Sequence, residues 1–220
     1  MFCDIHTHSI DYKNKSLVDV SDKDIDEIQK MGPLAFSAGI HPKYMENNID
    51  AKLLKIKEMA QKGMLTAIGE CGLDKFSEWD IATQEKCLLE QFIIAKEYGL
   101  PVIIHCVRLY SQILRIIKFT KFSNHVIFHC YNGNPDTTKQ LLNYDNIMYS
   151  YSEINIEPNC GGYKSLGSIP LNRILTESDV KKDTNFSKII YNISDVKKTG
   201  YHELIDQVEK NFDSIICRHK

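Results

Sequence analysis

Short apolar runs alternate with longer amphipathic stretches along the whole chain. In the amphipathic stretches, apolar residues recur at steps of three and four, which is typical of helices that bury one face. The apolar runs between them have the length of buried strands. The pattern predicts helices at 21–30, 49–62, 81–98, 109–118 and 135–142, and strands at 2–5, 34–37, 65–69, 102–105, 126–129, 147–152 and 173–176.

An unbroken alternation of strands and helices indicates parallel strands joined by right-handed crossovers. Six or seven such units favour an α/β fold of the TIM-type (β/α) barrel class over an open sheet. The chain has 220 residues, whereas about 250 is typical of such a barrel, so we expect a compact and distorted one. Its eighth strand is unclear, because 189–193 fits a strand and also a helix over 186–196. We expect a single domain over residues 1–220.

Composition and charge exclude several classes of protein. The formal net charge is −2, so broad charge attraction does not explain nucleic-acid binding, and a phosphate-bearing substrate must be held by a local site. No stretch approaches the roughly 20 apolar residues of a membrane span, and the first ten residues do not resemble a signal peptide. Seven cysteines without a CxxC pair indicate reduced thiols. These features predict a cytoplasmic protein without a membrane partner, with a monomer favoured.

The strongest chemical signal is Asp4-Ile5-His6-Thr7-His8, at the end of the first predicted strand. Alternate strand residues point the same way, so His6 and His8 project together, with Asp4 one layer below them. Two imidazoles on one face suit a divalent metal ion. The alternative interpretation is a polar strand end, or a histidine pair satisfied by hydrogen bonds.

Four further candidates lie at or just beyond the ends of later predicted strands: Glu70, His105, His129 and Asp179. A charged residue directly after a buried strand is costly unless it is solvated, paired or bound to metal. In βα barrels the carboxyl ends of the strands form the active face. We therefore expect all of these side chains at one rim, together with the two histidines of the first strand.

Six ligands exceed the three protein ligands that one catalytic metal commonly uses. We therefore expect two divalent ions that share Glu70. The first ion would also bind Asp179 and the two histidines of the first strand, and the second would bind His105 and His129. Paired ions can activate water for an in-line displacement. Asp179 is the expected general base beside that water, which makes Asp179 and Glu70 the candidate catalytic residues.

Six motifs follow one another along the chain: Asp4-Ile5-His6-Thr7-His8, Gly39-Ile40-His41-Pro42, Ala67-Ile68-Gly69-Glu70-Cys71-Gly72-Leu73-Asp74, Ile104-His105, Phe128-His129-Cys130-Tyr131-Asn132-Gly133 and Glu177-Ser178-Asp179. Their order is the one found in TatD-type deoxyribonucleases, and nearly the whole chain resembles that family. The resemblance implies a βα-barrel fold, divalent metal ions and metal-dependent nuclease activity on DNA. It favours Mg²⁺ or Mn²⁺ for activity, with Zn²⁺ as the alternative ion.

The resemblance also implies substrate contacts. His41 is expected to contact a substrate phosphate, and a turn histidine fixed by Pro42 is the alternative. The family commonly has an arginine two residues after the histidine of the fourth strand, which is His105 in this chain. Here that place is Val107 and Arg108 comes one residue later. Arg108 is therefore the candidate substrate contact, displaced by one position.

Several neighbours of the ligands have expected supporting roles. Asp74 is a candidate for orienting a ligand histidine from behind, and a solvated turn aspartate is the alternative. Asp4, one layer below the two histidines, is a candidate for supporting the ligands without binding the metal itself. Cys71, Cys106 and Cys130 each follow a proposed ligand by one residue. If the strands continue regularly, alternation turns these thiols toward the helix layer. We expect buried structural thiols rather than metal ligands or nucleophiles.

The sequence therefore predicts a metal-dependent hydrolase, first of all a deoxyribonuclease that uses a water activated by two metals. A metal-dependent amide or ester hydrolase on the same ligand set, for example one acting on aminoacyl esters, is the second hypothesis. A non-catalytic metal-binding barrel is the third.

Overall fold

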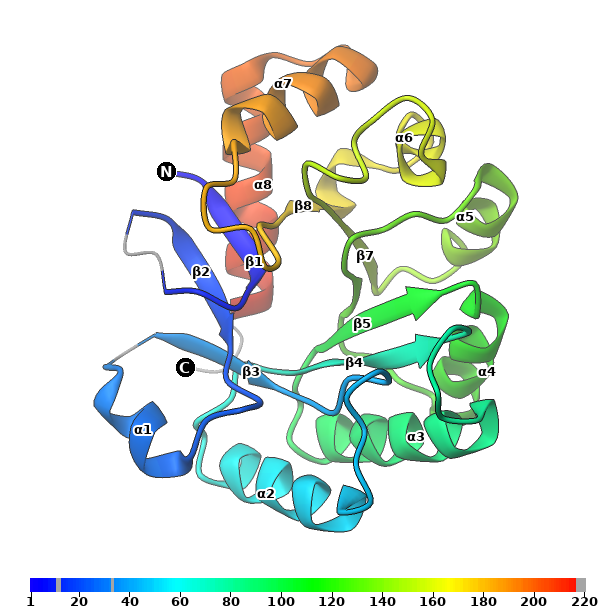
Figure 1. Ribbon diagram of the computed structural model, residues 1–220. Helices are drawn as coiled ribbons and strands as arrows, with labels where there is room; N and C mark the ends of the chain where they lie inside the picture. The colour runs from blue at the N-terminus through cyan, green and yellow to red at the C-terminus, as the bar shows by residue number, and fades with distance from the viewer. Residues whose placement is uncertain (11–12, 33, 217–220) are drawn as a thin grey trace. The chain divides into compact units, whose positions relative to one another are not determined.

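The computed structural model describes residues 1–10, 13–32 and 34–216 of the chain. Within these ranges eight strands are hydrogen-bonded in chain order, and most are separated by helices (Figure 1). The strands are β1 Cys3–Thr7, β2 Lys15–Asp19, β3 Ala35–Ala38, β4 Ala67–Asp74, β5 Val102–Val107, β6 Val126–Phe128, β7 Ile147–Tyr151 and β8 Ile174–Thr176. The helices are α1 Ile25–Lys30, α2 Ile49–Gln61, α3 Ile81–Glu97, α4 Tyr110–Thr120, α5 Pro135–Leu141, α6 Gly161–Leu166, α7 Phe186–Lys197 and α8 Tyr201–Ile216, with a 3₁₀ turn η1 at Leu171–Arg173. No helix in the described ranges has the length and apolar character needed to cross a membrane.

The last strand, β8, lies next to the first strand, β1. A parallel bridge joins Thr7, at the end of β1, to Asp179, just beyond β8. The pairs β3–β4, β4–β5 and β7–β8 are also parallel. Parallel strands in sequential order, with β8 next to β1, are the topology of a TIM-type (β/α) barrel. The fold class predicted from the sequence is confirmed.

The chain divides into two compact units. Unit 1 comprises Met1–Leu17 and Ile127–Lys220, and unit 2 comprises Val18–Val126. The divisions fall inside β2 and β6. Unit 1 therefore contains β1, β7 and β8 with the later helices, and unit 2 contains β3, β4 and β5 with α1 to α4.

In unit 1, α8 packs along β1 and β8 (Figure 1). Its buried residues recur at steps of three and four, as in an amphipathic helix: Leu204, Val208, Asn211, Phe212 and Ile215. Asn211 donates two hydrogen bonds of 2.8 Å from Nδ2, to the carbonyls of Leu171 and Ile174. These bonds fasten the start of β8, and with it the segment that carries Asp179.

In unit 2, α3 packs on β4 (Figure 1). The Asp80 side chain caps this helix by accepting a hydrogen bond from its first turn. Two buried glutamines on the helix then hold neighbouring backbone. Gln84 Oε1 accepts from the Asp74 N–H at 2.8 Å, and Gln91 Oε1 accepts from the Ile40 N–H at 2.7 Å. The helix thus positions both the end of β4 and the loop that carries His41.

The sequence pattern missed β2, which is the unidentified eighth strand. Its first residues, Lys15 and Ser16, are polar and only half-buried, so no apolar run marks its start. The described part of its link from β1, residues 8–10 and 13–14, contains no helix, so the expected strand–helix alternation fails there. The Lys15 N–H nevertheless donates to the Phe2 carbonyl, which pairs the starts of the two strands. The ambiguous residues 189–193 lie in helix α7.

Several strand ends also differ from the prediction. β4 and β5 run on to Asp74 and Val107, whereas β6 ends one residue early. A bulge lies inside β4, because Ile68 pairs with Val102 but Cys71 pairs with Ile104. A bulge bends a strand and redirects a side chain without ending the pairing. The predicted ligand Glu70 therefore sits within β4 rather than at its end.

Gly72 allows β4 to approach β5 closely. It pairs with His105, and a Cβ built on Gly72 would lie 1.9 Å from the His105 carbonyl oxygen. Its φ of 156° also disfavours other residues. The glycine of this motif is therefore needed to bring the backbones of two predicted ligand strands together.

Gly72→Ala is expected to lower the free energy of unfolding, with about 1–3 kcal/mol from backbone strain alone and more from the clash. Gly63→Ala is the matched control, because Gly63 also has a positive φ but open space around it. Urea unfolding of the two variants measures the difference. Equal losses in the two variants would contradict the close-packing argument.

Candidate metal centre

Backbone hydrogen bonds hold Asp179 against the end of β1. Its N–H donates to the His6 carbonyl at 3.0 Å, and its carbonyl accepts from the His8 N–H at 3.2 Å. Asp179 has a φ of 55°, so the chain turns in the left-handed region just beyond β8. The three predicted ligands His6, His8 and Asp179 therefore lie on two segments of unit 1 that are hydrogen-bonded to each other.

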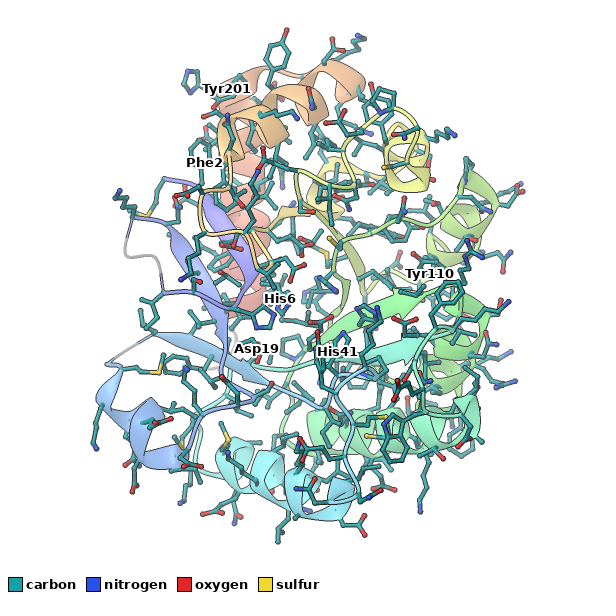
Figure 2. The ribbon with its side chains drawn as sticks, viewed as in Figure 1. Phe2, His6, Asp19, His41, Tyr110 and Tyr201 are labelled. Atoms are coloured by element: carbon teal, nitrogen blue, oxygen red, sulfur yellow. The ribbon has the colours of Figure 1, made fainter. Side chains whose placement is uncertain are left out.

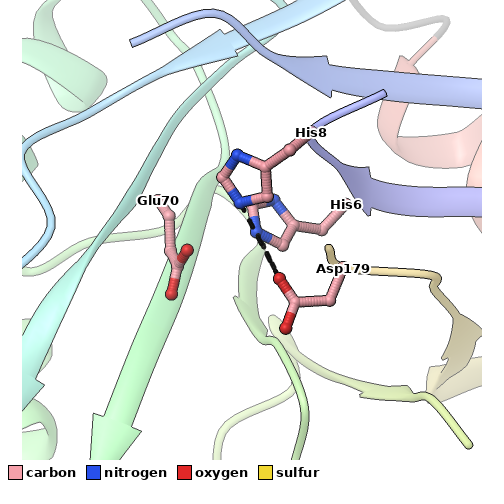
Figure 3. Close-up of side chains that lie close together, drawn as sticks. All are labelled: His6, His8, Glu70 and Asp179. Atoms are coloured by element: carbon pink, nitrogen blue, oxygen red, sulfur yellow. Dashed lines mark ion pairs between the residues drawn. The ribbon is translucent and has the colours of Figure 1, made fainter. Parts of the chain in front are cut away.

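The side chains of these three residues converge (Figure 3). The Nε2 atoms of His6 and His8 lie 3.8 Å and 3.7 Å from Asp179 Oδ1. Two donors that each bind one cation at about 2.1 Å lie no more than about 4.2 Å apart. These donors therefore fit one divalent ion. His6, labelled on β1 in Figure 2, is fully buried, whereas the His8 side chain is 40% exposed.

His129 belongs to the same group of side chains in unit 1. Its ring centroid lies 4.9 Å from that of His6, and one of its nitrogens lies within 4.8 Å of an Asp179 oxygen. We call His6, His8, His129 and Asp179 the Asp179 cluster. Three imidazoles and one carboxylate form a donor set that suits borderline divalent metals.

Glu177 lies behind this cluster and is fully buried. Its Oε1 is 3.5 Å from His129 Nδ1 and accepts a hydrogen bond from the Cys130 N–H. Burial by itself raises the pKa of this carboxyl, but the imidazoles of His129 and His6 hold the pKa of Glu177 below its ordinary value. Glu177 is therefore an anion that orients His129.

The prediction for the cysteines is wrong for Cys130. β6 ends at Phe128 and Cys130 has a φ of 44°, so strand alternation does not reach it. Its Sγ lies within 4.8 Å of donor atoms of His129 and Asp179, and 3.1 Å from Ser152 Oγ. Burial raises the pKa of this thiol, so it is a neutral neighbour of the cluster.

The other two thiols differ in exposure. Cys71 is fully buried, as predicted, and its Sγ donates to the Ile103 carbonyl. Cys106 is only half-buried. Burial raises the pKa of both thiols, which favours the protonated form.

Asp4 is hydrogen-bonded next to one of the predicted ligands. Its carboxylate oxygens accept hydrogen bonds from Ser178, at 2.9 Å from the N–H and 2.6 Å from Oγ. Burial raises the pKa of Asp4 to about 7. Because Ser178 directly precedes Asp179, these two hydrogen bonds hold the backbone beside Asp179 in place.

Glu70 is the centre of a second group, in unit 2. It is 6% exposed, and its N–H donates to Asp19 Oδ2 at 2.9 Å. Its Oε1 lies 3.2 Å from His41 Nε2 and 2.8 Å from His105 Nδ1. We call Glu70, His41 and His105 the Glu70 cluster. Their donor atoms all lie within 4.8 Å of one another, which also fits a metal ion.

The hydrogen bonds of His41 decide which role it can take. Its Nδ1 accepts a hydrogen bond from the Lys43 N–H at 3.1 Å, so that nitrogen carries the lone pair. Nε2 is then the protonated nitrogen and donates to Glu70. A protonated nitrogen cannot bind a metal, so in this arrangement His41 is a hydrogen-bond donor. Figure 2 labels it in the loop after β3.

His105 has a carboxylate on each side of its ring. Nδ1 faces Glu70, and Nε2 lies 3.1 Å from Asp74 Oδ2. Asp74 is fully buried, which excludes the alternative of a solvated turn residue. Burial raises its pKa, but hydrogen bonds from the Phe76 N–H, His105 and Lys43 hold the pKa of Asp74 below its ordinary value. An anionic Asp74 keeps the Nε2 proton in place and leaves Nδ1 as the nitrogen for a cation.

Comparison with known proteins identifies the family of this chain. The family of TatD-related DNases matches residues 4–216. The chain belongs to this family. A 3′-5′ ssDNA/RNA exonuclease TatD of Musicola paradisiaca is 32% identical over 108 residues, which is 48% of this chain and 41% of that protein. The chain thus spans about two fifths of the length of this relative.

Two solved structures share the fold of this TatD-family chain. YjjV, a TatD homologue of Escherichia coli, has a TM-score of 0.81 at 19% identity, over 92% of this chain and 86% of that one. A TatD-family hydrolase of Entamoeba histolytica has a TM-score of 0.76 at 18% identity, over 98% and 97%. These likenesses support the barrel fold.

This TatD-family chain places Arg108 just beyond β5. Arg108 has a φ of 61°, and its guanidinium carbon lies 5.2 Å from the centre of the Phe76 ring. The residue is exposed. The displaced arginine directly follows the strand that carries His105. Its positive φ ends the strand conformation at this residue.

Sequence reasoning did not single out three residues that support the ligands: Asp19, Lys43 and Glu177. Lys43 Nζ lies 3.3 Å from Asp74 Oδ2, behind His105. Asp19 lies at the end of β2, so it was missed together with that strand. Glu177 stands two residues before Asp179, and this spacing after an apolar strand was the available signal.

Proposed function

We propose that this chain is a metal-dependent hydrolase that cleaves phosphodiester bonds in nucleic acid, with DNA as the first substrate. The observation that carries the proposal is the pair of carboxylate–imidazole clusters, whose members lie within the C-terminal parts of strands or just beyond them in a (β/α) barrel topology. Enzymes of this fold keep their active residues at that end of the strands. Membership of the TatD-related DNase family supports the choice of bond. The Musicola relative, a 3′-5′ ssDNA/RNA exonuclease, supports a single-stranded substrate.

We propose further that the two clusters serve one metal centre in a single domain over residues 1–220. Its six ligands are His6, His8, Glu70, His105, His129 and Asp179. Glu70 is the proposed shared ligand of two divalent ions, Mg²⁺ or Mn²⁺ for activity and Zn²⁺ as the alternative. When bound, such ions polarise a phosphoryl oxygen and lower the pKa of a bound water.

The protein residues have separate proposed roles. Asp179 accepts the proton of the attacking water, because its side chain is 23% exposed and can return that proton to solvent. His41 donates a hydrogen bond from Nε2 to a phosphate oxygen of the substrate, in place of its hydrogen bond to Glu70. Asp74 holds His105, and Arg108 offers a positive charge to the substrate backbone.

Removal of metal should abolish hydrolysis. We expect a fluorescent single-stranded oligonucleotide to stay intact after EDTA treatment and to be cut again after Mn²⁺ is added. Metal at about 100 times its Kd should stabilise the fold by about 2.7 kcal/mol, which raises Tm by roughly 5–10 °C. Cleavage that resists EDTA, or a Tm that metal does not change, would contradict the proposal.

Hydrolysis of an amide or ester is the second candidate. The net charge of −2 and the displaced Arg108 favour it, because both weaken attraction for a polyanion. A panel of phosphodiester, ester and amide substrates separates the two. Metal-dependent cleavage of esters or amides, with intact nucleic acid, would replace the nuclease proposal. Metal binding without any cleavage would support the non-catalytic barrel.

A further inference from the structure

Two exposed aromatic side chains lie next to the Glu70 cluster. Tyr44 is 73% exposed and lies in the loop after β3, and Phe76 is 62% exposed and lies in the loop after β4. Single exposed apolar side chains are common on protein surfaces. Phe119 on α4 is also exposed, so exposure alone does not mark a site.

The two loops are tied to each other by hydrogen bonds. Ser77 Oγ donates to the Pro42 carbonyl at 2.7 Å, and Trp79 Nε1 donates to the Met45 carbonyl at 3.1 Å. The residues flanking Tyr44 are therefore joined to the residues that follow Phe76. Tyr44 and Phe76 thus belong to two loops of unit 2 that are hydrogen-bonded to each other.

Each ring is also linked to a candidate catalytic residue. The Tyr44 ring lies 4.9 Å from the His41 ring, with an angle of 33° between their planes, and His41 contacts Glu70. The Phe76 N–H donates to Asp74 Oδ1 at 2.7 Å, and Asp74 contacts His105. Substrate groups that lie on these rings would thus be next to the reacting phosphate.

Arg108 adds a positive charge beside one of the two rings. Its guanidinium lies on the Phe76 ring in a cation–π contact. Aromatic rings beside a cation are the usual combination for single-stranded nucleic acid, because every base has a face that can stack and every phosphate is an anion. Bases of a duplex are already stacked on each other and cannot use such rings.

We propose that Tyr44 and Phe76 form a stacking platform for unpaired bases, with Arg108 binding the adjacent phosphate. This inference rests on the proposed nuclease function and adds to it the residues that bind the unpaired bases of the strand. The platform sets the affinity for the strand, whereas the ligand clusters carry out hydrolysis.

The test compares two strands of equal length and charge, a thymidine oligonucleotide and an abasic one, with Mn²⁺-loaded protein. Phe76→Ala and Tyr44→Ala are each expected to raise KM for the thymidine strand by about 5- to 150-fold. KM for the abasic strand and kcat for both strands should stay close to wild type. Phe76→Tyr should keep the wild-type KM, because a tyrosine ring still stacks.

Phe119→Ala and Tyr191→Ala are the matched controls, since both rings are exposed but belong to helices α4 and α7 rather than to these loops. Unchanged KM in the Phe76 and Tyr44 variants, or equal losses for both strands, would overturn the platform. If wild type cuts neither strand, the proposed function fails, and fluorescence anisotropy of the labelled thymidine strand decides the platform separately. Binding that depends on Phe76 supports it, and binding that does not, or no binding, overturns it.

Discussion

Replacing Asp179 with asparagine is expected to lower kcat for a single-stranded oligonucleotide by about 10²- to 10⁴-fold, the usual contribution of a general base. Asparagine keeps the shape of the side chain and an oxygen near His6 and His8, but it cannot accept a proton at neutral pH. Metal content should therefore fall less than kcat. Steady-state kinetics together with elemental analysis of the purified variant measure both quantities.

Asp195→Asn is the control for the loss of one negative charge, because Asp195 is exposed on α7 and pairs with Lys198. It should keep the wild-type kcat. An Asp179→Asn variant with wild-type kcat would rule out Asp179 as the base. A variant that loses its metal in proportion to its activity would assign Asp179 to metal binding alone.

Glu70→Gln is expected to weaken metal binding and to reduce hydrolysis by more than about 100-fold. Partners that only orient a ligand commonly contribute 10- to 100-fold in metal affinity, and Glu70 is a proposed ligand itself. The neutral amide removes the charge that faces His41 and His105. Isothermal titration with Mn²⁺ and an oligonucleotide cleavage assay check the two effects.

Glu97→Gln provides the matched control for this change, because Glu97 is an exposed residue of α3 that pairs with Lys57. Such surface pairs contribute little to stability, so this variant should behave as wild type. A Glu70→Gln variant that binds Mn²⁺ and cuts DNA normally would remove Glu70 from the centre. The outcome would leave the barrel topology untouched.

The sequence was sufficient for the fold class because seven strands are apolar and are separated by amphipathic helices. It was insufficient for β2, since the polar residues Lys15 and Ser16 stand where the strand starts and the described part of its link from β1 contains no helix. Strand pairing across the sheet, rather than local pattern, defines such a strand. The bulge at Glu70 was hidden for the same reason, because register depends on the neighbouring strand.

The spacing of residues in the sequence predicted most of the candidate site, whereas the remaining contacts depend on backbone geometry that the sequence pattern does not specify. The alternation in Asp4-Ile5-His6-Thr7-His8 predicted that His6 and His8 project together, and they do. Cys130 escaped the same rule because its positive φ breaks the alternation. The contact between Lys43 and Asp74 depends on a fold of two loops that no local pattern specifies.

The most direct test of the metal centre is anomalous diffraction from a crystal of the wild-type protein soaked in Mn²⁺. A centre of two metal ions predicts two manganese peaks. One should lie within bonding distance of His6, His8 and Asp179, the other within that of His105 and His129, and Glu70 should contact both. No peak at these side chains, or a peak bound only by other residues, would contradict the account.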